Sequence, residues 1–271
     1  MSYMVFANSA HLWVRTTKGN IQNGVVELGR TANLLRKLKL LHNPKQRRHP
    51  IQLVIFDLDG TITYEDYWHK LHEELGTSTY SKTVTERYQN GSLSFKEWTT
   101  LEVQAWSETP VHKIQTILDS IPYRTGARET FTQLHDSKIR TVIVSAGLSL
   151  IADRAARQLG CELAMANKLE INNGKLSGKV EINVTIDNKK EVIKQIASNL
   201  RIPLKAIALI GDSAADLPIK DCLRITYKPY HWSARQAANI VVEDDDLQAL
   251  LPHLIPEQQK NSHTKTNHDT L

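Results

Sequence analysis

Short apolar runs recur along the chain from Ile51 onward, and most of them end at Asp, Ser or Gly. Between them lie stretches whose apolar positions have helical spacing, such as residues 148–159 and 189–200. Continuous apolar strands that alternate with amphipathic helices are typical of a parallel sheet covered on both faces. The pattern therefore predicts an α/β core. The expected strands are residues 52–56, 140–145, 206–211 and 239–242.

Two parts of the chain depart from this alternation. Residues 168–182 interrupt the alternation of strands and helices and predict a β-hairpin that turns at Asn173-Gly174. Residues 65–122 contain three or four short helical patterns instead of strands. They predict a small helical cap inserted after the first strand, with a core formed by residues 51–64 and 123–255.

The two ends differ in composition from this body. Residues 1–50 hold nine Lys or Arg and one acid, a local charge of +8, whereas the rest holds 25 bases and 28 acids, or −3. This distribution disfavours nucleic acid as a partner, because a basic folded face is missing. Residues 25–41 could form a basic amphipathic helix, and the polar residues 256–271 are expected to be disordered.

Two interpretations of the basic leader stay open. It is a targeting or membrane-surface segment in weak contact with a membrane or an import machinery, or it is a solvated extension without a role. The sequence contains no run of eighteen apolar residues that would predict a transmembrane segment. Cys161 and Cys222 lie in apolar contexts without metal-ligand spacing and are expected to be reduced. These features favour a cytoplasmic protein, with organelle targeting through the leader as the alternative.

Polar residues collect where the predicted strands end. Because the carboxyl ends of parallel strands meet at one edge of the sheet, these residues are expected to lie close together. A lysine at the start of the helix before the third strand joins them. The residues are Asp57, Asp59, Ser145, Lys189, Asp212 and Asp216.

This set of residue types suits phosphoryl transfer. Three carboxylates at one point repel each other unless a hard cation binds among them, and oxygen ligands suit Mg²⁺. One carboxylate can attack phosphorus, and a second can protonate the leaving alcohol. A lysine, a hydroxyl and backbone N–H groups stabilise the charge on the transferred phosphoryl group.

DLDGT at 57–61, VSAG around Ser145, the lysine and GDSAAD at 211–216 resemble the four motifs of the haloacid dehalogenase-like superfamily. The resemblance covers residues 51–254 and is greatest to the phosphoserine-phosphatase-like branch, which carries a helical cap at this position. It implies a Rossmann-like core and phosphatase activity on a small phosphorylated metabolite. Asp59 supports a phosphatase, because the dehalogenases of this superfamily lack an acid at that place.

The resemblance also implies a role for each motif residue. Asp57 is the nucleophile and Asp59 the general acid and base. Mg²⁺ binds to Asp57, the backbone carbonyl of Asp59, and Asp212, with Thr61 and Asp216 in support. The phosphate binds to Ser145, the backbone N–H of Ala146, and Lys189, with Lys190 as a rival for the lysine role.

The cap departs from the phosphoserine enzymes of this branch. Glu102 stands where they carry a carboxylate-binding arginine, and Asp66 stands where they carry an amine-binding glutamate. Two acids facing the substrate would repel a carboxylate, so the sequence favours a small phosphomonoester other than phosphoserine. Two alternatives stay open: a phosphoserine phosphatase, and a phosphate-binding or regulatory protein of the same fold without turnover.

The cap also holds three tryptophans, Trp68, Trp98 and Trp106. Either they pack the small cap core, or they line the pocket and hold an amine or a quaternary ammonium. His69 and His72 lie beside acids on the same segment and are expected to be solvated, not to bind metal.

Overall fold

The computed structural model describes residues 4–8, 11–15, 49–64 and 67–256. The chain divides into two compact units, residues 1–46 and 47–271. In the first unit, β1 (Met4–Asn8) pairs antiparallel with β2 (His11–Arg15), a hairpin that the sequence analysis did not anticipate. The expected helix at 25–41 and the tail from residue 257 lie outside the described residues.

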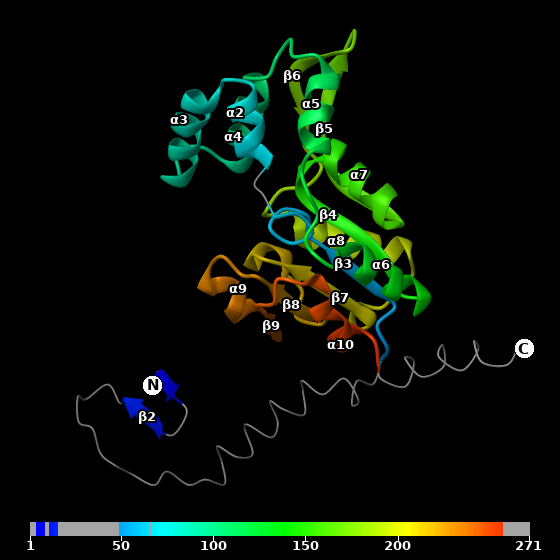
Figure 1. Cartoon of the computed structure of the whole chain (residues 1–271). Helices are drawn as coiled ribbons and strands as arrows, with labels where there is room; N and C mark the ends of the chain where they lie inside the picture. Colours follow the sequence, from blue (N-terminus) through cyan, green and yellow to red (C-terminus); the bar gives the residue numbers. More distant parts are fainter. Residues whose placement is uncertain (1–3, 9–10, 16–48, 65–66, 257–271) are drawn as a thin grey trace, which may run out of the picture. The chain divides into compact units, whose positions relative to one another are not determined.

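The second unit is built on a seven-stranded sheet in the order β6-β5-β4-β3-β7-β8-β9 (Figure 1). Neighbouring strands run parallel except for the antiparallel pair β5 and β6. The predicted α/β fold with a mostly parallel sheet is confirmed. The strands are β3 (Leu53–Phe56), β4 (Arg140–Leu148), β5 (Leu163–Asn172), β6 (Lys175–Glu181), β7 (Ile207–Gly211), β8 (Leu223–Tyr227) and β9 (Ile240–Val242).

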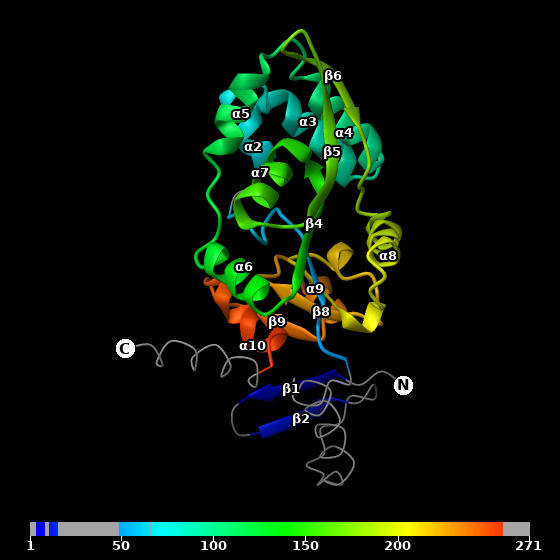
Figure 2. The same ribbon diagram turned by 90° about the vertical axis from the view of Figure 1, so that its right-hand side faces the viewer.

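Strand β3 is buried on both faces, which explains its continuous apolar sequence. Val54 and Phe56 belong to one apolar cluster, and Leu53 and Ile55 belong to the other. Residues of α6 (Ala127–Asp136) and α7 (Ser149–Leu159) fill the first cluster, and residues of α8 (Lys189–Asn199) fill the second. Figure 2 shows α8 and the α6–α7 pair on opposite sides of the sheet. The remaining core helices are α9 (Trp232–Ala237) and α10 (Leu251–Leu254).

The β5–β6 hairpin turns at the predicted Asn173-Gly174, where both residues have positive φ, 51° and 76°. Two central residues with positive φ are typical of a tight type I′ turn. The hairpin also contacts the segment that closes the cap. Glu108 N donates to the Leu176 carbonyl, and Leu176 N donates to the Thr109 carbonyl, both at 2.9 Å. The hairpin therefore joins the core sheet to the cap.

The region expected to be a cap contains four helices in its described residues, and the first three along the chain lie grouped together in Figure 1. Ser94 caps α4: its hydroxyl accepts from Glu97 N, and the Glu97 carboxylate accepts from Ser94 N. The cap is tied to the core by Tyr67, whose hydroxyl accepts a 2.6 Å hydrogen bond from Leu148 N. The helices are α2 (Tyr67–Glu74), α3 (Ser78–Gln89), α4 (Phe95–Gln104) and α5 (Val111–Asp119).

Both cysteines carry free thiols in the structure. Cys222 is buried, and burial raises the pKa of the Cys161 thiol to about 12. A thiol that stays protonated is a poor nucleophile, so Cys161 has no reactive character. None of the described helices has the length and hydropathy to cross a membrane.

We expect Phe131→Ala to lower the free energy of unfolding by about 3–5 kcal/mol, since it empties a fully buried site. The Phe131 ring lies 4.6 Å from that of Phe56 on the central strand. Urea unfolding followed by circular dichroism measures the change. The control is Trp232→Ala, whose residue is 60% exposed and which should cost no more than about 0.5 kcal/mol. Equal losses in the two variants would contradict the assignment of Phe131 to the core.

Candidate active site

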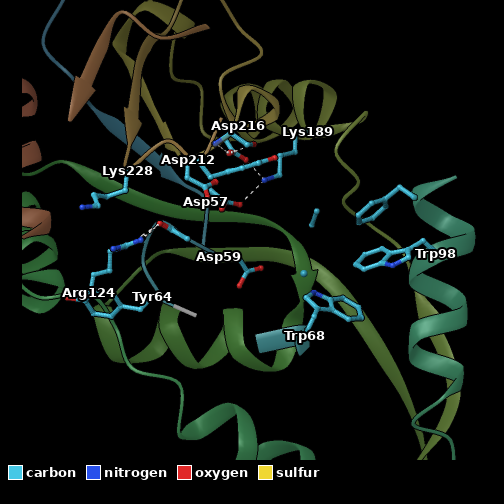
Figure 3. A pocket seen from close by; sticks show the side chains of 16 residues that line it. Asp57, Asp59, Tyr64, Trp68, Trp98, Arg124, Lys189, Asp212, Asp216 and Lys228 are labelled. Carbon is cyan, nitrogen blue, oxygen red and sulfur yellow. Dashed lines mark hydrogen bonds and ion pairs between the residues drawn. The ribbon is translucent and has the colours of Figure 1, made fainter. Parts of the chain in front are cut away.

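The predicted acids meet at the carboxyl edge of the sheet, where β3 and β7 end (Figure 3). Asp57 follows β3 directly, and its backbone N–H donates to the Ile210 carbonyl on β7 at 2.8 Å. Asp212 follows β7, and Asp216 ends the short 3₁₀ turn Ala214–Asp216. Carboxylate oxygens of Asp57, Asp212 and Asp216 all lie within 4.8 Å of one another. The sheet topology thus brings together residues more than 150 positions apart.

Lys189 joins two of these acids. It is the first residue of α8, and its buried Nζ lies 2.7 Å from Asp57 Oδ1 and 2.5 Å from Asp216 Oδ1. The second oxygen of Asp216 accepts from the backbone N–H and the hydroxyl of Ser213, which fixes the carboxylate within its turn. Lys190, the rival from the sequence, is exposed. The geometry therefore places Lys189 in the site and Lys190 outside it.

Burial and mutual repulsion perturb the acids. Burial and then the Asp216 charge raise the pKa of Asp57 to about 7, against the opposing effect of Lys189. Burial, Asp57 and Asp216 together raise the pKa of Asp212 to about 8. Burial lowers the pKa of Lys189, but its two carboxylate partners outweigh it and leave that pKa raised. One ammonium does not balance three carboxylates, so the cluster fits a divalent cation with oxygen ligands.

Gly60 and Gly211 have no side chain, and this makes room for the cluster of acids. A Cβ on Gly60 would lie 2.2 Å from Asp212 Oδ2, and φ at Gly60 is +71°. A Cβ on Gly211 would lie 2.2 Å from the Asp216 Cβ. Real Cβ atoms do not approach other heavy atoms so closely, so any side chain at these positions would displace an acid.

The predicted phosphate-binding loop lies at an irregularity in β4. The strand runs on to Leu148, so Ser145 lies within it and not at its end, and the register shifts between Val144 and Leu148. Ser145 Oγ is buried and accepts from Gly147 N at 2.9 Å. The Ala146 carbonyl accepts from the buried Asn167 side chain at 2.7 Å, which holds the loop in place.

Asn167 was missed by the sequence analysis. Its Oδ1 accepts from the backbone N–H groups of Asn183 and Val184, which precede α8. One amide therefore links the β4 loop to the segment that leads to Lys189. The available signal was an amide that directly follows the apolar residues 163–166 of β5.

A cavity of about 580 Å³ connects these residues to the cap. Asp57, Asp59, Ala146, Lys189, Asp212 and Asp216 line it, whereas the buried Ser145 and Thr61 are not among its lining residues. Asp59 packs close to Gly147, where a Cβ would lie 2.9 Å from its Oδ2. Figure 3 shows Asp59 between the carboxylate cluster and the rings of Trp68 and Trp98. The two acids of the first motif thus share one cavity.

The specificity residues expected from the cap have other surroundings. Glu102 is 1% exposed and is not among the lining residues; its carboxylate contacts His72 Nε2. Asp66 lies outside the described residues. The expectation that His72 is solvated is wrong, because His72 is itself 1% exposed. Its Nδ1 also accepts from the indole N–H of Trp106 at 3.3 Å.

Four core residues that the sequence analysis did not single out also line the cavity: Tyr64, Arg124, Lys228 and Tyr230. Arg124 donates two hydrogen bonds to the Gly60 carbonyl, at 2.7 and 3.2 Å, and its guanidinium lies 4.8 Å from the centre of the Tyr64 ring. Arg124 therefore fixes the turn after Asp57 and Asp59. The first residues after the cap gave no sequence pattern that would have indicated this contact.

Residues 54–220 match the haloacid dehalogenase-like hydrolase family. A phosphoserine phosphatase from Methanocaldococcus jannaschii is 28% identical over 208 residues, covering 75% of this chain and 97% of the relative. A substrate-bound phosphoserine phosphatase structure matches with TM-score 0.68 and 26% identity over 76% of this chain and 100% of that one. The structure of a phospho-aspartyl intermediate analogue of phosphoserine phosphatase matches with TM-score 0.67 and 26% identity. The match covers 76% of this chain and 99% of that one. The resemblance stated from the motifs is confirmed.

We expect Gly60→Ala to weaken the binding of a divalent cation at least about tenfold, because the new Cβ would displace the Asp212 carboxylate. Isothermal titration with Mg²⁺ measures the affinity. The matched control is Gly76→Ala, where φ is +70° and no atom lies within 4 Å of the added methyl group. It should show the same backbone strain, about 1–2 kcal/mol, with unchanged Mg²⁺ affinity. Equal affinity in both variants would contradict the role of this close approach.

Proposed function

The chain belongs to the haloacid dehalogenase-like hydrolase family, and we propose that it hydrolyses a small phosphomonoester through an aspartyl-phosphate on Asp57. One observation carries this proposal: Asp57, Asp212 and Asp216 lie within 4.8 Å of one another, Lys189 pairs with two of these acids, and Asp59 lines the same cavity. A binding protein without turnover would have no use for the second carboxylate of the Asp57/Asp59 pair. The arrangement therefore favours an enzyme.

The residues support a two-step reaction. A carboxylate oxygen of Asp57 attacks phosphorus while the bond to the leaving oxygen breaks, and Asp59 gives its proton to the leaving alcohol. Asp59 then takes a proton from water, which attacks the aspartyl-phosphate and releases inorganic phosphate. Lys189 and the backbone N–H of Ala146, two residues that line the cavity, would stabilise charge on the phosphoryl oxygens.

The acids fit Mg²⁺ as the divalent ion. Asp57, the Asp59 carbonyl and Asp212 would hold it, and Asp216 would support the site through Lys189 and Ser213. When bound, Mg²⁺ neutralises charge on the phosphate and on the acids. The raised pKa values of Asp57 and Asp212 support this assignment, because they reflect carboxylates that are buried and repel neighbouring acids.

Phosphoserine is the first substrate candidate, although the sequence analysis disfavoured it. The Methanocaldococcus jannaschii relative, which matches over 75% of this chain, is a phosphoserine phosphatase, and so is the substrate-bound structure that matches over 76%. The argument against phosphoserine depended on Glu102 facing the substrate, and Glu102 contacts His72 inside the cap. The position of that acid therefore gives no reason to exclude a carboxylate-bearing substrate.

A second candidate is a phosphomonoester that lacks a carboxylate. Among the described residues, the cap contributes only Trp68, Phe95 and Trp98 to the cavity. These rings offer no cation for a substrate carboxylate, whereas they do offer surface to an uncharged or amine-bearing group.

We expect Asp57→Asn to abolish phosphate release while the fold is kept, because an amide does not attack phosphorus. Phosphate release from phosphoserine with Mg²⁺ measures activity, and circular dichroism checks the fold. BeF₃⁻ should form an adduct on Asp57 in the native protein only. Turnover by the variant within tenfold of native would contradict the covalent mechanism. Phosphate binding without turnover in the native protein would instead support the regulatory alternative.

Competing measurements on phosphoserine and phosphoethanolamine distinguish the two substrate candidates, because the compounds differ only by the carboxylate. If the relatives indicate the substrate correctly, kcat/KM for phosphoserine should be higher by at least about tenfold, or 1.4 kcal/mol. The reverse preference would support the carboxylate-free candidate. Glu102→Gln should leave the ratio of the two substrates within about threefold, because Glu102 is not among the lining residues.

A further inference from the structure

Three aromatic rings of the cap line the cavity on the side away from the metal-binding acids. Trp68 comes from α2, and Phe95 and Trp98 lie one turn apart on α4, so they share a helix face. Ring centroids lie 5.2 Å apart for Trp68 and Trp98 and 5.6 Å apart for Phe95 and Trp98. The rings therefore form one continuous surface, which we call the aromatic wall. Figure 3 shows Trp68 and Trp98 facing the space beside Asp59.

The aromatic wall differs from the rest of the cap core. Trp106 is fully buried, whereas all three rings of the wall are half-buried and border the cavity. The tryptophans thus serve both purposes that the sequence left open, packing for Trp106 and cavity lining for Trp68 and Trp98.

A network of polar side chains inside the cap holds the aromatic wall in place. The indole N–H of Trp98 donates to Thr85 Oγ1 at 3.1 Å, and Thr85 Oγ1 makes a longer 3.4 Å contact with Glu102 Oε1. Through His72, the same carboxylate reaches the indole of Trp106, whose ring lies 5.2 Å from that of Trp68. Both tryptophans of the wall are therefore tied to the Glu102–His72 pair. Groups fixed in this way need little reordering when a ligand binds.

We infer that Trp68, Phe95 and Trp98 form the subsite for the leaving group, and that this subsite takes an alcohol carrying an aromatic ring close to its phosphate. The inference rests on the proposed phosphatase activity. A flat ring can bury its face against the wall and contact the indoles in offset or tilted geometry. Thr85 is a positioning residue that holds Trp98 in the orientation which a ligand ring needs.

Hydrolysis of 2-phenylethyl phosphate and ethyl phosphate tests the subsite. Both are alkyl esters, so their reactivity is similar and the phenyl ring is the main difference. We expect kcat/KM for the phenyl compound to be higher by at least about tenfold in the native enzyme. Trp98→Ala should reduce this ratio to about threefold or less, and Trp98→Phe should largely keep it. The control Trp232→Ala, outside the cavity lining, should leave the ratio unchanged.

A second pair separates ring stacking from recognition of a cation. Phosphocholine and 3,3-dimethylbutyl phosphate have the same shape, but only the first carries a positive charge. Stacking predicts that neither exceeds 2-phenylethyl phosphate in kcat/KM. If kcat/KM for phosphocholine exceeds that for both compounds without an ammonium group, the wall recognises an alkylated ammonium and the proposed ligand class is overturned.

The positioning role of Thr85 has its own matched pair. Thr85→Val keeps the shape but removes the acceptor for the Trp98 indole, whereas Thr85→Ser keeps the hydroxyl. We expect the ratio of phenylethyl to ethyl turnover to fall at least about threefold in the Val variant and to stay near native in the Ser variant. Equal ratios in both variants would overturn the positioning role.

The outcomes separate this inference from the proposed function. Hydrolysis of ethyl phosphate or phosphoserine without any preference for the phenyl ring would overturn the aromatic subsite alone. If the native enzyme with Mg²⁺ hydrolyses none of these esters, the proposed function fails and the subsite fails with it.

Discussion

Lys189 Nζ lies 2.7 Å from Asp57 and 2.5 Å from Asp216, and all three side chains are buried. Removing one partner of a buried ion pair typically costs about 3–5 kcal/mol, because the remaining charge is left uncompensated. Here two carboxylates share one ammonium, and Asp212 brings a third within 4.8 Å. The site thus carries an excess of negative charge that a divalent cation can offset. The glycines at 60 and 211 keep these groups close, so charge balance and close packing constrain the same sheet edge.

The parts of the site that sequence reasoning predicted are those fixed by topology. A strand that is apolar at every position is buried on both faces, and β3 has this pattern because helices cover both of its sides. Once the strands are parallel, their carboxyl ends share an edge, and Asp57 and Asp212 must lie close. The position at the start of the helix indicated a lysine, and the resemblance to the family motif favoured Lys189 over Lys190, which is exposed. The inferences about the acids depend on a residue's position along an element.

The parts that were missed depend on the direction in which a side chain points. Glu102 was assigned to the cavity because it stands where the phosphoserine enzymes carry an arginine, but that match does not determine which neighbours the side chain meets. Its burial depends on His72 and Thr85 from two other helices. Asn167 and Arg124 likewise act through backbone groups that are distant in sequence, the Ala146 and Gly60 carbonyls. Contacts between a side chain and a distant backbone leave no periodic pattern.

The acids of the core and of the cap have different surroundings. The core acids face the cavity, where a cation can offset their charge, whereas Glu102 contacts His72 inside the cap, away from the cavity. Among the described residues, the cap therefore lines the cavity with rings and adds no charged side chain that would compete with the ions of the core. An apolar cover also excludes water, and electrostatic interactions strengthen when water is removed. The burial of Glu102 inside the cap thus supports the chemistry of Asp57 as much as it supports the choice of leaving group.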